Sequence, residues 1–215
     1  MKSIHALLLL PILWSCDKSQ VAGSGSQTGN SVVAGRILTA DSTKGAAGVT
    51  VYLRPLSWTS GQPAPAGALD SVHSDSFGNY KFTGVPHDTY RIEARYFDSG
   101  WSRTVRASAD QNSVAEGALH RLGTLDVEVD LTDSLRGGSL EIYGLDRSIA
   151  IPTAGADDSG IHLIFDRLPV GLHTIRVWNN NKNFGDTAVH VTPGDTTHVD
   201  FDSMNGKPEG PLEDP

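Results

Sequence analysis

The chain has 215 residues, of which 38% are hydrophobic and 7% aromatic, with 23 glycines and 11 prolines. This length suits one large domain or two small ones, and the glycine and proline content favours a turn-rich chain over a helical one. The net charge of −8 at pH 7 argues against nucleic acid as a partner, and the single cysteine excludes an internal disulfide.

The N-terminus carries a targeting pattern. Lys2 precedes an apolar run at 6–13, which is far shorter than the roughly 20 residues that a membrane-spanning helix needs. Cys16 follows closely. The pattern resembles a bacterial lipoprotein signal, which implies that residues 1–15 are removed as a signal peptide and that Cys16 is lipidated. The alternative is an ordinary secretory signal with a chance cysteine.

Two further segments have no hydrophobic period. Residues 17–30, after the lipidated Cys16, are small, polar and glycine-rich, so 16–30 is predicted to be a flexible linker. For a glycine-rich coil its root-mean-square reach is about 20 Å. Residues 204–215 belong to a proline-containing stretch and are predicted to be a disordered tail.

Between these segments the hydrophobic period is two. In the first half, alternating strands are expected at 33–38, 49–53 and 90–97. In the second half they are expected at 125–131, 140–143 and 197–201. Each strand has one apolar face, which predicts antiparallel sheets with one side buried. The nearest approach to a helical pattern, at 108–119, is weak, so the chain is predicted to be all-β.

The two halves also resemble each other. A turn ending in Gly78 is followed by a strand, Pro86 and a second strand, and the same order recurs around Gly160 and Pro169. Glycine permits the turn, and proline ends a strand because it has no N–H to donate. We therefore expect two tandem β-sandwiches of about seven strands each, the first at 31–122 and a divergent second at 123–203.

The charge differs between the predicted domains. Residues 31–122 carry nine Lys and Arg against eight Asp and Glu, a balance of +1. Residues 123–203 carry five against thirteen, a balance of −8. Different surfaces are therefore expected on the two domains.

The first half resembles the carboxypeptidase regulatory-like domains, which are β-sandwiches of the transthyretin-like or starch-binding-like kind. The resemblance rests on the order of five elements, namely Val33 to Ile37, Gly48 to Leu53, Asp75 to Phe82, Val85-Pro86 and Tyr90 to Ile92. It implies a non-catalytic stalk, spacer or binding module.

No catalytic motif contradicts this. None of the histidines after the signal begins an H-x-x-E pair, and there is no nucleophile elbow, Walker loop or dinucleotide fingerprint. We expect no enzyme activity, no cofactor and no metal. His190, His198 and Asp200 are outward in their predicted strands, which allows a metal patch, but two solvated histidines beside a turn are favoured.

Exposed aromatic residues are the better candidates for binding. Trp58 lies in a proline- and glycine-rich insert, Phe97 and Trp101 flank a predicted hairpin loop, and Trp178 precedes the asparagine run 179–183. Aromatic rings flanked by amides and hydroxyls are typical of sugar-binding surfaces.

Two hypotheses about function follow. In the first, a lipid-anchored envelope protein, at the outer membrane or cell surface rather than the inner membrane, binds a ligand such as a polysaccharide. It predicts that Trp58, Phe97 and Trp101 gather on one exposed face. In the second, the protein is a structural scaffold that contacts an envelope protein through its sheet edges, and those aromatic side chains are buried.

Overall fold

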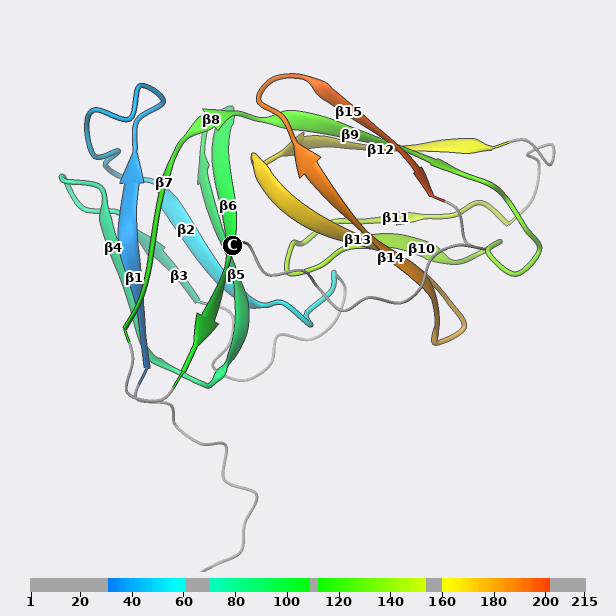
Figure 1. The fold of residues 1–215 in the computed structure, drawn as a ribbon, viewed down its shortest axis with the longest axis horizontal. Helices are drawn as coiled ribbons and strands as arrows, with labels where there is room; N and C mark the ends of the chain where they lie inside the picture. The colour runs from blue at the N-terminus through cyan, green and yellow to red at the C-terminus, as the bar shows by residue number, and fades with distance from the viewer. Residues whose placement is uncertain (1–30, 61–69, 109–111, 154–159, 202–215) are drawn as a thin grey trace, which may run out of the picture.

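The computed structural model describes residues 31–60, 70–108, 112–153 and 160–201, and every regular element in these ranges is a β-strand (Figure 1). The all-β prediction is confirmed. No helix in the described ranges could cross a membrane. The predicted signal peptide, Cys16, the linker and the tail lie outside the described residues.

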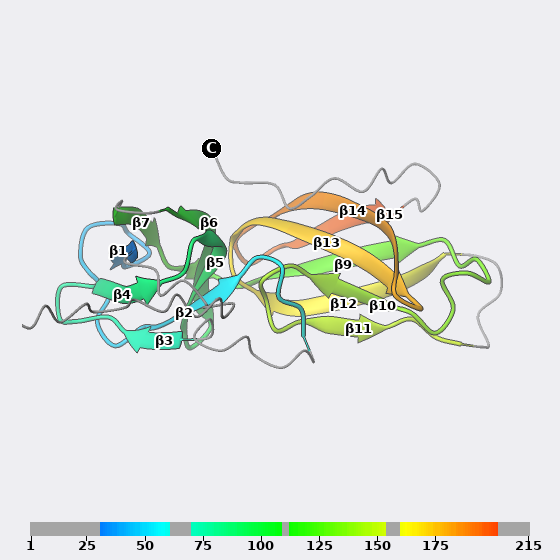
Figure 2. The same ribbon diagram turned by 90° about the horizontal axis from the view of Figure 1, so that it is seen from below.

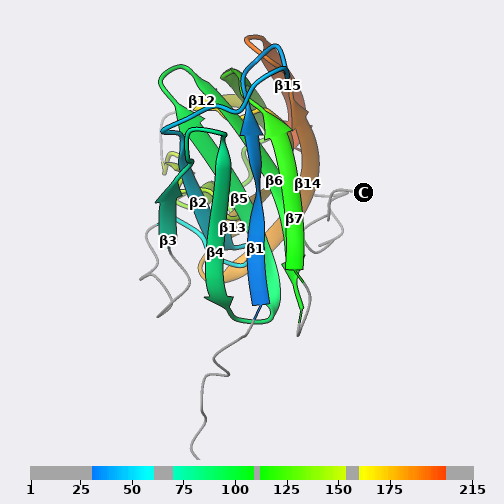
Figure 3. The ribbon, with the colours of Figure 1, turned by 90° about the vertical axis from the view of Figure 1, so that its left-hand side faces the viewer.

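Two sheets form the first sandwich, which spans 31–121. One sheet has the order β4-β1-β7 and the other the order β3-β2-β5-β6-β8. Figure 3 shows β1 flanked by β4 and β7 in the layer nearest the viewer. The strands are β1 (Ser31–Leu38), β2 (Thr50–Pro55), β3 (Asp70–His73), β4 (Asn79–Val85), β5 (Asp88–Tyr96), β6 (Ser99–Ala107), β7 (Asn112–Ala118) and β8 (His120–Arg121).

Two more sheets form the second sandwich, which spans 123–201. Their orders are β12-β9-β15 and β11-β10-β13-β14, and in Figure 1 the first of these lies above the second. The strands are β9 (Gly123–Val129), β10 (Ser139–Ile142), β11 (Ser148–Ala150), β12 (Ile161–Leu168), β13 (Gly171–Asn179), β14 (Lys182–Val191) and β15 (Thr196–Phe201).

The two sandwiches have the same topology. β1 corresponds to β9, β2 to β10, and so on to β7 and β15, while β8 has no counterpart. Seen from below, they follow each other along the long axis (Figure 2). The internal repeat in the sequence therefore reflects a repeated seven-strand unit.

The sheets differ from the expectation in one respect, because each sandwich contains a parallel pair. β7 runs parallel to β1, and β15 runs parallel to β9. Alternation of apolar residues shows which strand face is buried but not the strand direction. The segment 108–119, which came nearest to a helical pattern, contains the parallel strand β7.

Each sandwich has a hydrophobic core of its own. Val33, Val51 and Ile92 lie fully buried in the first core, and Leu125 and Ile175 lie fully buried in the second. These residues come from the inward positions of the alternating strands, so the period-two pattern correctly identified the core faces.

Candidate functional site

The candidate site lies where the two sandwiches meet, and two contacts build this junction. In the first, the β12–β13 turn packs on the outer face of β5 and β6. Nη1 of Arg91 donates a hydrogen bond to the carbonyl oxygen of Leu172 over 2.5 Å. The Ser102 N–H donates a second one to the carbonyl oxygen of Val170 over 2.9 Å. Arg91 is only 1% exposed, although alternation placed it on the solvent side. The outer face of β5 is therefore covered by the second sandwich.

The second contact runs the other way, from the segment after β2 to the β10–β11 turn. The Gly144 N–H donates to the carbonyl oxygen of Trp58 over 3.1 Å, and Oγ of Ser60 donates to Oδ1 of Asp146 over 2.7 Å. Trp58 is 7% exposed, and the Arg54 guanidinium lies 5.6 Å from the centre of its ring. Residues 56–60 thus link the two sandwiches, and we call this segment the clasp.

The expected exposed face of Trp58, Phe97 and Trp101 is not formed. Trp58 is buried in the junction. Trp101 lies in β6, and its ring covers Gly117, where a Cβ atom would lie 2.0 Å from Cε2 of the indole. Phe97 is 82% exposed and packs edge-on against Tyr96, with 4.6 Å between ring centres. Both tryptophans are covered by segments distant in sequence, which a strand pattern cannot reveal.

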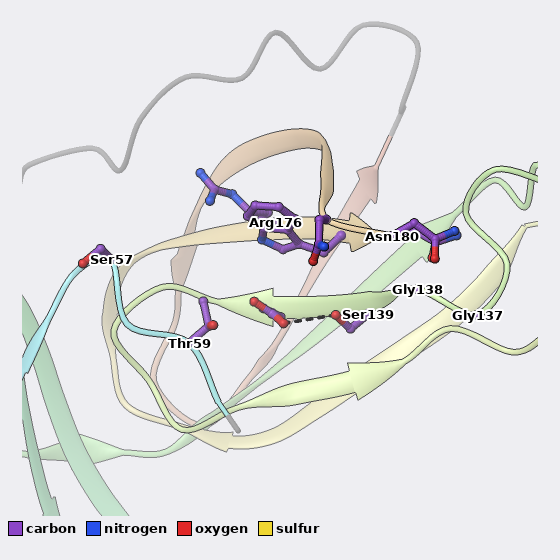
Figure 4. Close-up of a pocket in the computed structure, with 11 residues that line it drawn as sticks. Ser57, Thr59, Gly137, Gly138, Ser139, Arg176 and Asn180 are labelled. Carbon is purple, nitrogen blue, oxygen red and sulfur yellow. Dashed lines mark hydrogen bonds between the residues drawn. The ribbon is translucent and has the colours of Figure 1, made fainter. Parts of the chain in front are cut away.

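Trp178, the fourth aromatic candidate, lines a groove to which both sandwiches contribute. This Trp178 groove has a volume of about 460 Å³. In Figure 4, Ser57 and Thr59 approach it from the first sandwich, whereas Ser139 and Asn180 belong to the second. Its lining residues are Ser57, Thr59, Gly137, Gly138, Ser139, Glu141, Arg176, Trp178, Asn179, Asn180 and Asn181.

The asparagine run shapes one wall of the Trp178 groove. Asn180 and Asn181 form the β13–β14 turn with φ angles of 48° and 62°, which asparagine tolerates better than most residues. Nδ2 of Asn179 donates to the carbonyl oxygens of Ser134 (2.8 Å) and Arg136 (3.0 Å). The wall is therefore fixed by the chain's own hydrogen bonds.

The charges in the groove are largely satisfied by the protein. Nε and Nη2 of Arg176 donate to the two carboxylate oxygens of Asp186 over 2.6 and 2.8 Å. The same guanidinium lies 4.0 Å from the ring centre of Tyr143 and 5.1 Å from that of Trp178. Oγ of Ser139 donates to Glu141 over 3.1 Å. Ring stacking and paired charges orient Trp178 and leave a polar, aromatic-walled groove.

Another polar cluster lies on the outer face of β12, β9 and β15. Nδ1 of His162 and Nδ1 of His198 lie 2.9 and 3.1 Å from the two oxygens of Asp126. The hydrogen bond to Asp126 raises the pKa of His162 above its usual value. No group of three side chains in the described ranges is arranged to hold a metal ion. Alternation had singled out His198 but missed its partners, because only the sheet order brings Asp126 between the histidines.

Comparisons with known proteins show similarity of structure only. No sequence profile of a known protein family matches the chain, and no curated protein is detectably similar in sequence. The structure is similar to the Bacillus anthracis TIE protein (14% identity over 79% of this chain and 32% of that one, TM-score 0.33). It is also similar to a Streptococcal ancillary pilin (13% identity over 79% and 62%, TM-score 0.34).

A third similar structure is a Pseudomonas aeruginosa protein that is described provisionally as carbohydrate-binding (16% identity over 44% of this chain and 92% of that one, TM-score 0.32). The chain spans less than two thirds of the TIE protein and of the pilin. All three TM-scores are below 0.5, and membership of the carboxypeptidase regulatory-like family stays a prediction. With such low TM-scores these neighbours assign no function.

Proposed function

We propose that the protein is a non-enzymatic binding module of the bacterial cell envelope that holds a carbohydrate in the Trp178 groove. The observation that carries this proposal is the lining of the groove. Trp178 supplies an aromatic surface, and hydroxyl, amide and main-chain groups surround it on both sides. Sugars combine apolar ring faces with many hydroxyl groups, so this mixture suits them better than it suits a purely apolar ligand.

The rigidity of the groove supports the same proposal. The Arg176–Asp186 pair and the Tyr143 ring hold Trp178 on one side, and the Asn179 hydrogen bonds hold the turn on the other. A ligand therefore meets walls that are already in place, and less conformational entropy is lost on binding.

The lipid anchor is part of the proposal. Lipidation of Cys16 would hold the protein at a membrane, and the linker 17–30 would let the sandwiches stand off its surface. An outer-membrane or cell-surface position would bring the Trp178 groove within reach of envelope or external polysaccharides.

A titration tests the proposal. The full chain, purified in detergent, is titrated with a panel of soluble polysaccharides while tryptophan fluorescence and heat of binding are recorded. We expect saturable binding to at least one member, weakened about ten-fold by Trp178→Ala, since an aromatic stacking contact is worth about 1.4 kcal/mol.

Two further variants separate binding from folding. Ser57 is exposed and lines the groove, so Ser57→Arg should block binding without disturbing a core. Phe97→Ala removes an exposed aromatic ring elsewhere and should bind like the wild type. If no polysaccharide binds, or if Ser57→Arg binds normally, the carbohydrate proposal is wrong.

The alternative function is a structural scaffold that contacts an envelope protein. The scaffold hypothesis predicted that Trp58, Phe97 and Trp101 are buried. Burial of Trp58 and the packing of Trp101 on Gly117 favour it, whereas the exposed Phe97 does not. A protein that folds cooperatively but binds no polysaccharide would support this alternative. Crosslinking in intact cells would then identify the partner.

A further inference from the structure

A second, smaller pocket lies next to the clasp, whose Ser60 is bonded to the pocket residue Asp146. It has a volume of about 170 Å³, and we call it the arginine pocket. It combines the outer faces of β2 and β5 with the β10–β11 turn. Its lining residues are Tyr52, Arg54, Glu93, Arg95, Asp146 and Arg147. Both sandwiches therefore contribute charged side chains to it.

The lining contains three guanidinium groups but only two carboxylates. Glu93, with a side chain 3% exposed, pairs through one oxygen with Arg54 and through the other with Arg95. Asp146 accepts the hydrogen bond from Ser60. The arginine pocket thus carries an excess positive charge in a chain whose net charge is −8.

Of the three pocket arginines, Arg147 has no carboxylate partner among the described residues. Its Nη1 makes a 3.4 Å hydrogen bond to the carbonyl oxygen of Asp146, and its buried Nε has no acceptor in the described ranges. Burial, followed by the charge of Arg95, lowers the pKa of Arg147. Since an arginine keeps its proton, this position gains from an added anion.

The clasp connects the arginine pocket to the Trp178 groove. Ser57 and Thr59 line the groove, whereas the next residue, Ser60, is bonded to Asp146 of the arginine pocket. Arg54, which lines the arginine pocket, lies against the ring of Trp58. One extended ligand could therefore contact both sites across this short segment.

We propose that the arginine pocket binds the carboxylate of a uronic acid, so that the carbohydrate held by the Trp178 groove is an acidic polysaccharide. This inference rests on the proposed function. Guanidinium groups bind carboxylates through paired hydrogen bonds, and a 170 Å³ pocket suits one such group. The acidic surface of the whole chain disfavours a densely charged polyanion, whereas a polymer with well-spaced carboxylates meets less repulsion.

The test compares ligands that differ only in charge. The full chain in detergent is titrated with oligosaccharides that carry one uronate (galacturonate, glucuronate or mannuronate) among neutral sugars, and with their methyl esters. We expect the acid form of at least one series to bind about ten-fold more tightly than its ester, as for one well-placed charged hydrogen-bond pair. This preference should shrink as salt is raised from about 0.05 to 0.5 M.

Arg147→Gln should bring the acid and ester affinities together. Arg121→Gln removes the same charge from an exposed position outside both sites and should leave the preference unchanged. If acid and ester bind equally to the wild type, the uronate inference is wrong while the carbohydrate proposal stands. If neutral polysaccharides bind but neither form of any series does, the uronate inference is likewise wrong and the carbohydrate proposal stands.

An independent readout is the Arg147 Nε–H signal in a nitrogen–proton NMR spectrum, assigned by its loss in Arg147→Gln. It should shift on addition of free glucuronate but not of glucose. An unchanged signal would overturn the arginine pocket as an anion site. Failure of every polysaccharide to bind would instead remove the proposed function, and this inference with it.

Discussion

The two sandwiches share one topology, yet equivalent positions in them hold different chemistry. Tyr90 in β5 and His173 in β13 are the clearest pair. The Tyr90 hydroxyl donates to the carbonyl oxygen of Pro86 over 3.1 Å, and Nε2 of His173 lies 2.8 Å from that of Pro169. Both sandwiches thus have a buried polar side chain four residues after the proline, a tyrosine in the first and a histidine in the second.

The two cores also hold different side chains at equivalent positions. Gly35 pairs with Tyr80 in the first sandwich, and the equivalent pair in the second is Val127 and Leu163. A Cβ on Gly35 would lie 2.7 Å from the Tyr80 hydroxyl oxygen and 1.7 Å from the carbonyl oxygen of Ala115. The absence of a side chain at Gly35 makes room for the larger tyrosine, so the pairs fill similar volumes in different ways.

The outer faces differ most, and they carry the proposed sites. Tyr52, Arg54, Glu93 and Arg95 occupy the outer face of β2 and β5. The equivalent positions of β10 and β13 hold Glu141, Tyr143, Arg176 and Trp178. Packing in the core constrains which side chains fit on the inner faces. On the outer faces the side chains can vary, and they can contact a ligand or the other sandwich.

The largest expected effect comes from cavities at equivalent core positions. Ile92→Ala and Ile175→Ala should each lower the free energy of unfolding by about 2–5 kcal/mol, because both side chains are fully buried. Urea unfolding followed by circular dichroism measures this. Ile164→Ala, at a position 52% exposed, should change stability by at most about 0.5 kcal/mol. Wild-type stability in either core variant would contradict the equivalence of the two cores.

A smaller effect should distinguish His173 from Tyr90. Burial, with the charge of Arg91 second, lowers the pKa of His173 to about 3. The unfolded chain takes up the proton near pH 6.5, but the folded protein resists it. Stability is therefore lost as pH falls below about 6.5, by up to about 1.4 kcal/mol per pH unit.

Urea titrations at pH 7 and pH 5 measure this loss. His173→Gln should reduce the difference between the two pH values by about 2 kcal/mol, because no imidazole is left to charge. His87→Gln removes an exposed imidazole from the β4–β5 turn and serves as the control. An unchanged pH dependence in His173→Gln would show that the buried imidazole does not resist protonation.

The smallest effect concerns the Tyr80 hydroxyl, which has no counterpart at Leu163. Tyr80→Phe should lower the free energy of unfolding by about 1 kcal/mol, because it removes a buried 2.7 Å hydrogen bond to Ala115. Tyr90→Phe removes a longer, half-buried hydrogen bond and should cost less. Thermal unfolding of both variants ranks them, and the reverse order would refute the role given to Tyr80.

Much of the fold could be predicted from the chain alone. Alternation identified the core faces of strands such as β2 and β9, because a residue's side of a strand depends only on its position. Gly78 with Pro86, and Gly160 with Pro169, revealed the internal repeat because turn and strand-end chemistry is local. Trp178 and the neighbouring asparagines line one groove because they are adjacent in the chain, whereas their role in binding stays a prediction.

Only the tertiary structure decided which outer faces became buried and which became sites. Alternation predicted Arg91 and Glu93 on the solvent side. The start of β13, about eighty residues away in sequence, covers Arg91, and Glu93 is buried between Arg54 and Arg95. The same junction buried Trp58 and brought Ser57 to the Trp178 groove and Arg147 to the arginine pocket. These contacts join residues that are far apart in the chain. Local periodicity carries no information about contacts between residues distant in sequence.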